Sequence, residues 1–195
     1  MNGMKAASRN LLIGFLALGL SGCGAVVVGS VATGAVVAHD RRTTGTVVDD
    51  QEIFLKAISI RHDDAELEQK SNINVDVFNQ QVLLTGQAEN MPLVESYVQR
   101  VAAIPKVRNV FNEVVIGAES TFGESTADSY LTTKVKLALF GVKVEGFDPT
   151  RVKVTSSLGS VYLMGLVTPQ EADAVTNEAR FVSGVKRVVK LFEYL

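Results

Sequence analysis

Apolar and polar residues alternate in two pairs of short segments, one in the middle of the chain and one near its end. The first pair covers residues 73–77 and 81–86, and the second covers residues 152–156 and 160–165. Alternation with a period of two is typical of β-strands that bury one face. The pattern therefore predicts two pairs of strands, each joined by a turn, with a spacing of 79 residues between the pairs.

Segments with helical patterning flank both pairs of strands. One helix is predicted before each pair, at residues 50–61 and 128–140, and one after each pair, at residues 93–103 and 170–182. The later helices each follow a proline, which suits a first helical turn. The earlier helices each open on an aspartate that is predicted to be the N-cap: Asp50 and Asp128.

Both repeats close with a third predicted strand that opens on a valine, at residues 107–110 and 185–188. Two helices can cover one face of a mixed three-stranded sheet and bury its alternating apolar residues. The chain is therefore predicted to be an α+β protein with two tandem domains, at residues 49–117 and 127–195, and a linker at residues 118–126.

A glycine is predicted to end the second strand of each repeat, Gly86 in the first and Gly165 in the second. We interpret both as structural glycines, because such positions need either a backbone conformation that other residues avoid or a space without a Cβ. Close approach to a ligand is the alternative.

The first 22 residues have the features of a bacterial signal peptide. Lys5 and Arg9 supply positive charge, and the apolar residues 11–20 are too few to cross about 30 Å of hydrocarbon as a helix. Residues 20–23, Leu-Ser-Gly-Cys, resemble the lipobox of bacterial lipoproteins. This resemblance implies that Cys23 becomes the new N-terminus and carries a diacylglycerol and an N-linked acyl chain such as palmitate. The alternative is a buried cysteine behind an uncleaved anchor.

Residues 23–48 are predicted to be the lipidated N-terminus and a tether. The apolar segment 25–38 contains glycines and β-branched valines, which form helices poorly in water. Joined to residues 11–20, it could instead form one long transmembrane helix. In bacterial lipoproteins an aspartate after the cysteine favours the inner membrane, and Gly24 stands here. By that resemblance we expect the outer membrane, on its periplasmic face.

Charge and the scarcity of histidine argue against several functional classes. Cleavage before Cys23 leaves four more acidic than basic residues, whereas nucleic-acid binding needs a basic surface. His39 and His62 lie outside any catalytic motif, so we expect neither an enzyme nor a metal or organic cofactor. His62 with Asp63 and Asp64 could bind a metal ion, but a solvated loop is the simpler interpretation.

The predicted helix at residues 128–140 carries apolar residues on two sides. At 100° per residue, one side suits the core and holds Leu131, Val135, Ala138 and Leu139. The other side groups large apolar residues with a threonine and two bordering lysines: Tyr130, Thr133, Lys134, Lys136, Leu137 and Phe140. Such a surface suits the headgroup region of an anionic bilayer. Burial against the first domain is the alternative.

The first repeat serves as an internal control for this surface. With a shift of 78 residues, polar or charged residues replace the three large apolar ones: Glu52 for Tyr130, Ser59 for Leu137 and His62 for Phe140. The comparison predicts that the apolar outer surface belongs to the second domain alone.

The repeat as a whole resembles the BON domain. The resemblance rests on Gly86 and Gly165 and on a Gly-Val-x-x-Val element at residues 184–188, from which the first repeat departs at residues 105–110. With the lipobox included, residues 20–195 resemble outer-membrane lipoproteins of Gram-negative bacteria that carry two BON domains.

This resemblance implies a non-enzymatic protein that supports outer-membrane integrity and gathers at the division site. It also implies that the first helix of the second domain binds anionic phospholipid, phosphatidylglycerol above all. The residues assigned to that role are Tyr130, Leu131, Thr133, Lys134, Val135, Lys136, Leu137 and Phe140. The outer-membrane protein assembly machinery is a candidate partner, and we expect a monomer that binds no nucleic acid. The rival interpretation is a protein-interaction surface without lipid recognition.

Overall fold

The computed structural model describes residues 40–117 and 122–195, which belong to one compact unit. Cys23, the signal peptide and the tether up to residue 39 lie outside the described residues, as do residues 118–121 of the predicted linker. Within the described part, no helix combines the length and the apolar character needed to cross a bilayer.

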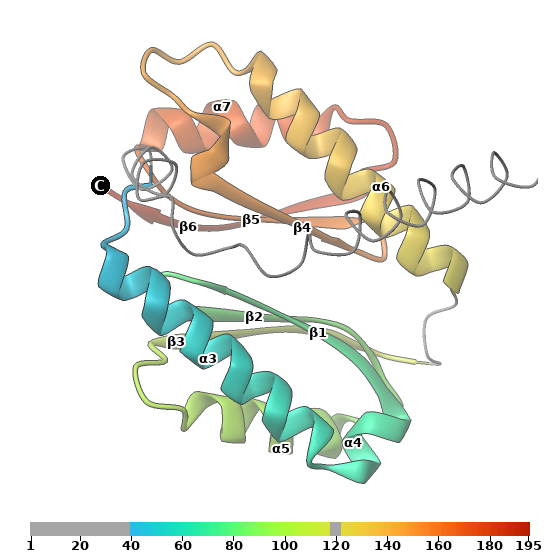
Figure 1. Cartoon of the computed structure of the whole chain (residues 1–195). Coiled ribbons are helices and arrows are strands. Elements are labelled where there is room, and N and C mark those ends of the chain that lie inside the picture. The colour runs from blue at the N-terminus through green and yellow to red at the C-terminus, as the bar shows by residue number, and fades with distance from the viewer. Residues whose placement is uncertain (1–39, 118–121) are drawn as a thin grey trace, which may run out of the picture. The chain divides into compact units, whose positions relative to one another are not determined.

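The described residues form two α+β domains with the predicted order of elements, which confirms the predicted fold class (Figure 1). The first domain contains α3 (Thr44–His62), α4 (Ala65–Lys70), β1 (Ser71–Phe78), β2 (Gln81–Ala88), α5 (Met91–Ala102) and β3 (Asn109–Ile116). The second contains α6 (Phe122–Ala138), the short 3-10 turns η2 (Leu139–Gly141) and η3 (Pro149–Arg151), β4 (Val152–Ser157), β5 (Ser160–Val167), α7 (Pro169–Arg180) and β6 (Arg187–Tyr194). The short helix α4 was not predicted.

Each domain has a three-stranded mixed sheet with the second strand in the centre. β1 runs antiparallel to β2 and β3 runs parallel to it, and β4, β5 and β6 repeat this arrangement. Two helices pack on one face of each sheet, α3 and α5 in the first domain and α6 and α7 in the second (Figure 1). The alternating strand residues that point toward the helices form one apolar core per domain.

The prediction that Asp50 and Asp128 cap their helices is wrong. Thr43 caps α3, and α3 and α6 both begin before these aspartates, five residues ahead of the predicted domain starts. The two carboxylates instead accept backbone N–H groups of the turn between the first two strands: Asp50 from Asn79 and Gln80 at 2.7 and 2.6 Å, and Asp128 from Leu158 and Gly159 at 2.8 and 3.1 Å. A tight turn, like a helix N-terminus, leaves N–H groups unpaired, so both select a short acceptor side chain.

The later helices begin as their prolines predict. Asn90 caps α5 by accepting the backbone N–H of Leu93 at 3.0 Å, and Pro92 lies in the first turn. Pro169 opens α7, where Thr168 and Glu171 form a capping box.

The prediction that Gly86 and Gly165 end their strands is also wrong, since both strands run two residues further. Gly86 has φ +113°, and a Cβ there would lie 2.0 Å from the backbone oxygen of Asn72 on β1. At Gly165 a Cβ would lie 3.0 Å from the backbone oxygen of Arg151. Both glycines are thus needed for close packing, and Gly86 also for its left-handed conformation.

The sheet faces that carry no helices share a third apolar cluster: Phe78, Leu83, Tyr162, Met164 and Leu191. Ion pairs join charged residues of the two domains around this cluster: Arg187 with Glu113 at 2.7 Å, Arg108 with Glu193 at 2.9 Å and Lys153 with Asp76 at 2.8 Å. The domains therefore contact each other through their sheets and leave the outer surface of α6 available.

Candidate functional site

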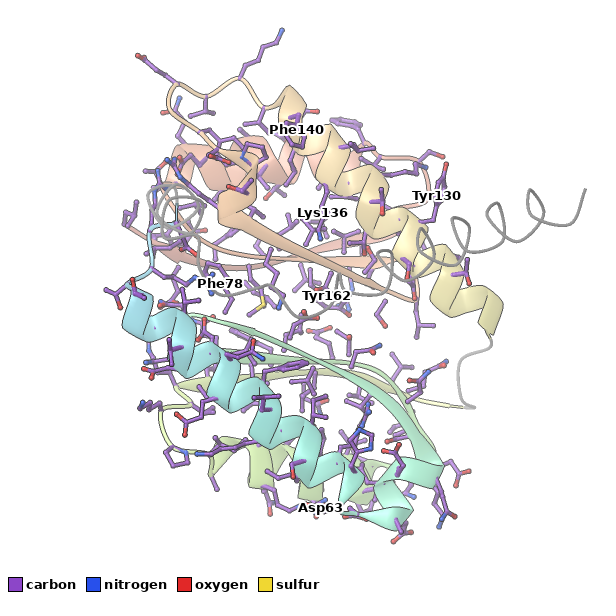
Figure 2. All side chains as sticks on the ribbon, in the orientation of Figure 1. Asp63, Phe78, Tyr130, Lys136, Phe140 and Tyr162 are labelled. Carbon is purple, nitrogen blue, oxygen red and sulfur yellow. The ribbon has the colours of Figure 1, made fainter. Side chains whose placement is uncertain are left out.

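The outer surface of α6 is the strongest candidate for a functional site. Its large apolar side chains are well exposed: Tyr130 by 68%, Leu137 by 65% and Phe140 by 71%. Figure 2 shows Tyr130, Lys136 and Phe140 spread along the helix and the 3-10 turn that contains Phe140. We call this surface the α6 patch and define it as Tyr130, Thr133, Lys134, Lys136, Leu137 and Phe140. The alternative of burial against the first domain does not match these exposures.

The opposite side of the helix enters the core, as its pattern predicts. Leu131, Val135 and Leu139 are buried in the core of the second domain, while Ala138 is only partly covered. Leu131 and Val135 were among the residues assigned to lipid binding. Their place in the core means that they hold the helix on the domain, and the surface contacts are left to the α6 patch.

Lys134 is fixed beside the aromatic end of the patch. Its ammonium nitrogen lies 5.5 Å from the centroid of the Tyr130 ring and donates a hydrogen bond to the backbone oxygen of Ser183. Lys136 is exposed, and the Thr133 hydroxyl donates to the backbone oxygen of Ser129 at 3.1 Å. The patch thus combines aromatic surface with positive charge, an arrangement that suits a boundary between water and an anionic layer.

Phe181 is a further exposed aromatic residue of the second domain that the sequence argument missed. It is exposed by 76%, more than any other large apolar side chain in the described part of the chain, and the guanidinium of Arg180 lies 4.7 Å from its ring centroid. It stands two residues before Ser183, whose backbone oxygen accepts a hydrogen bond from Lys134 of α6. The 78-residue shift places Ala103 at this position in the first domain, and extending the internal comparison to this loop would have found it.

The first domain has a mixed surface at the corresponding helix. Glu52, Ser59 and His62 are exposed where Tyr130, Leu137 and Phe140 stand, as predicted. However, α3 also exposes Val48 and Leu55. Both domains therefore expose apolar side chains on this helix, and only the second exposes aromatic ones. The two surfaces differ less than the sequence comparison predicts.

The alternative metal site at the end of α3 is not assembled. His62 pairs with Glu68 at 3.2 Å, and Asp63, labelled in Figure 2, accepts the Ser59 hydroxyl at 3.1 Å. Asp64 caps α4 and pairs with Arg100 at 2.7 Å. Among the described residues no three metal-binding side chains come together.

Comparison with known proteins supports the resemblance seen in the sequence. The profile of the BON domain family matches residues 62–118 and 127–195. Outer membrane lipoprotein DolP of Haemophilus influenzae is 38% identical over 177 residues, which cover 90% of each chain. The 21 kDa hemolysin of Actinobacillus pleuropneumoniae is 36% identical over 159 residues, which cover 80% of this chain and 79% of that protein.

Solved structures show only a slight likeness. CdsD, a structural protein of the type III secretion system of Chlamydia trachomatis, matches with 16% identity and a TM-score of 0.27, over 74% of this chain and 92% of CdsD. The C-terminal domain of CdsD in a second structure gives 15% identity and a TM-score of 0.29, over 75% of this chain and 67% of that one. The assignment therefore rests on the family match and the sequence relatives, by which this chain belongs to the BON domain family as a two-domain member of the DolP type.

Proposed function

We propose that the protein is a lipoprotein of the outer membrane, on the periplasmic face, whose second BON domain binds anionic phospholipid through the α6 patch. The observation that carries the proposal is the exposure of Tyr130, Leu137 and Phe140 beside two lysines, on α6 and the 3-10 turn that follows it. The lipobox at Cys23 and the relationship to an outer membrane lipoprotein support the anchor and the location. The family resemblance also supports a non-enzymatic role in outer-membrane integrity at the division site.

The energies involved favour reversible contact. A fully buried aromatic or leucine side chain gains roughly 1.5–3 kcal/mol on leaving water. Each lysine near an anionic surface adds roughly 1 kcal/mol and makes binding sensitive to salt. A patch of three partly inserted side chains and two lysines therefore suffices for orientation, while stable attachment falls to the acyl chains on Cys23.

The described end of the tether is bound to the second domain. Arg41 forms a bidentate ion pair with the buried Glu171, at 2.6 and 2.8 Å, and donates to the backbone oxygen of Leu166 at 3.0 Å. These hydrogen bonds hold the pKa of the Glu171 carboxyl below its ordinary value, so the pair stays charged at neutral pH. The neighbouring Arg42 lines the same depression as Lys136 and Phe140. An anchored tether would thus enter the fold beside the proposed membrane-binding helix.

The proposal predicts selective binding to vesicles. The mature chain with Cys23→Ser, which cannot be acylated, should sediment with phosphatidylglycerol vesicles and not with vesicles of phosphatidylcholine alone. Added salt should weaken the binding, because the lysine contribution is electrostatic. Equal binding to both kinds of vesicle would contradict lipid recognition by charge. An absence of binding to either would favour a protein-interaction surface.

The anchor gives a separate prediction. The chain should incorporate labelled palmitate and fractionate with the outer membrane, because Cys23 follows a complete lipobox. Cys23→Ala should abolish the label and release the protein from that fraction. Labelling of Cys23→Ala, or fractionation of the wild type with the inner membrane, would show that the proposed anchor is wrong.

A further inference from the structure

A depression of about 440 Å³ lies next to the aromatic end of the α6 patch, within the second domain. Tyr130 and Lys134 line it from α6. Gly159, from the turn between β4 and β5, and Gly184 and Lys186, from the loop between α7 and β6, line it from the other side. The depression therefore opens where aromatic surface and positive charge already meet.

The first domain offers an equivalent place for comparison, and hydrogen bonds establish the equivalence. The backbone N–H of Arg108 donates to the oxygen of Gln80, and that of Lys186 donates to the oxygen of Gly159, both at 2.9 Å. Asp50 and Asp128 bind the corresponding turns in the same way. The walls of the depression are therefore the same elements in both domains.

A lysine spans this place in the first domain. Lys106 reaches from the loop to α3, where its ammonium lies 2.6 Å from Asp49 and 3.9 Å from Glu52. The second domain has three smaller or uncharged residues at these positions: Gly184 for Lys106, Ala127 for Asp49 and Tyr130 for Glu52. Lys106 has φ +73° and Gly184 has φ +103°, so the loop takes a left-handed residue in both cases. The second domain has thus lost the lysine that reaches from the loop and the two carboxylates that held it, and the lysine that joins helix and loop there is Lys134 of α6, which donates to the backbone oxygen of Ser183.

The charges that remain around the depression favour an anion. Lys134 comes from α6, with its ammonium donating to the backbone oxygen of Ser183, and Lys186 comes from the same loop as Ser183. Asp128 also lines the depression, but its carboxylate accepts the N–H groups of Leu158 and Gly159 and is thereby occupied. Ammonium groups and a tyrosine hydroxyl are donors that suit phosphate oxygens.

We propose that this depression is a headgroup pocket, which binds the phosphodiester of one anionic phospholipid while its acyl chains lie toward the exposed side chains of the α6 patch. The pocket rests on the proposed function, because it specifies which part of the second domain recognises the headgroup. A lipid, rather than free phosphate, is the fitting occupant because Tyr130 belongs to both the pocket and the apolar patch.

The test fills the pocket as the first domain does. The double variant Ala127→Asp with Gly184→Lys, made in the mature chain with Cys23→Ser, introduces into the second domain the ion pair that Lys106 and Asp49 form in the first. It leaves Tyr130 and the rest of the α6 patch unchanged. We expect roughly tenfold weaker binding to phosphatidylglycerol vesicles, since the headgroup loses its charge-assisted hydrogen bonds. The matched control, Lys106→Gly in the first domain, should bind as the wild type does.

A second measurement separates a lipid from a free anion. Soluble short-chain phosphatidylglycerol, kept below its micelle concentration, should shift the amide NMR signals of the lining residues Gly159 and Ser183 in the wild type and not in the double variant. Equal shifts at equal concentrations of inorganic phosphate would overturn the lipid assignment. If the double variant does not fold, Lys186→Ser replaces it and should also weaken vesicle binding.

The outcomes distinguish the pocket from the proposed function. If the wild type binds phosphatidylglycerol vesicles and the folded double variant binds them equally well, the headgroup pocket is wrong and the α6 patch stands. A wild type that binds no vesicles would overturn both.

Discussion

Gly86→Ala should destabilise the protein by about 3–5 kcal/mol, because it adds backbone strain to a steric overlap. The residue has φ +113°, where side chains are disfavoured, and the new methyl group would lie 2.0 Å from the Asn72 oxygen. That oxygen belongs to the backbone of β1, so relief requires β1 and β2 to move apart and open the core of the first domain. Urea unfolding followed by circular dichroism measures the change.

Gly165→Ala is the matched control in the second domain. Its Cβ would lie 3.0 Å from the Arg151 oxygen and its φ is not left-handed, so the expected loss is about 1–2 kcal/mol. Gly165→Val adds branches to that tight site and should cost a few kcal/mol. An unchanged unfolding curve for Gly86→Ala would refute the structural role and return the position to the ligand-binding alternative.

The sequence predicted the sheets well because strand burial leaves a direct record. Val82 and Leu84 face the helices, whereas Leu83 lies in the cluster between the sheets. The buried residues on the face that packs against the helices produce the alternating apolar pattern of each strand. The apolar residues on the other face make this alternation less regular. They also leave the contact between the domains unpredicted, because an apolar sheet face does not by itself indicate which surface covers it.

The helix starts were harder to predict, because an aspartate can either cap a helix or bind a turn. An aspartate before an apolar helix resembles an N-cap, but Asp50 and Asp128 bind turns that lie 29 to 31 residues further along the chain. Such a distant partner leaves no mark in the local pattern, so the starts of α3 and α6 were missed. Thr43, the actual cap of α3, lies within residues 23–48, which the sequence assigns to the lipidated N-terminus and tether.

The candidate site was predictable as far as helical periodicity reaches. The burial of Leu131 and Val135 and the exposure of Tyr130, Leu137 and Phe140 follow from 100° per residue. Phe181 lies directly after the end of α7, where helical periodicity no longer assigns a side, so its exposure could not be predicted in this way.

Tyr130→Glu should abolish capture by phosphatidylglycerol vesicles while the fold survives. The ring is 68% exposed, so inserting it into the acyl boundary gains only part of the roughly 1.5–3 kcal/mol of full burial, about 1–2 kcal/mol. A glutamate loses this gain and meets a repulsion of about 1 kcal/mol near an anionic surface. The total of about 2–3 kcal/mol is on the order of 100-fold in the dissociation constant.

Phe140→Glu, at the other end of the α6 patch and outside the headgroup pocket, should have a similar effect. Ser59→Glu is the control, because Ser59 occupies the position of Leu137 on the exposed side of α3 and adds the same charge to the first domain. Vesicle sedimentation of the unacylated mature chain measures all three variants, and their unfolding curves should match that of the wild type. A folded Tyr130→Glu variant that still sediments with phosphatidylglycerol vesicles would refute lipid binding by the α6 patch. Unfolding of that variant, or separation of its two domains, would instead mean that Tyr130 serves an internal interface.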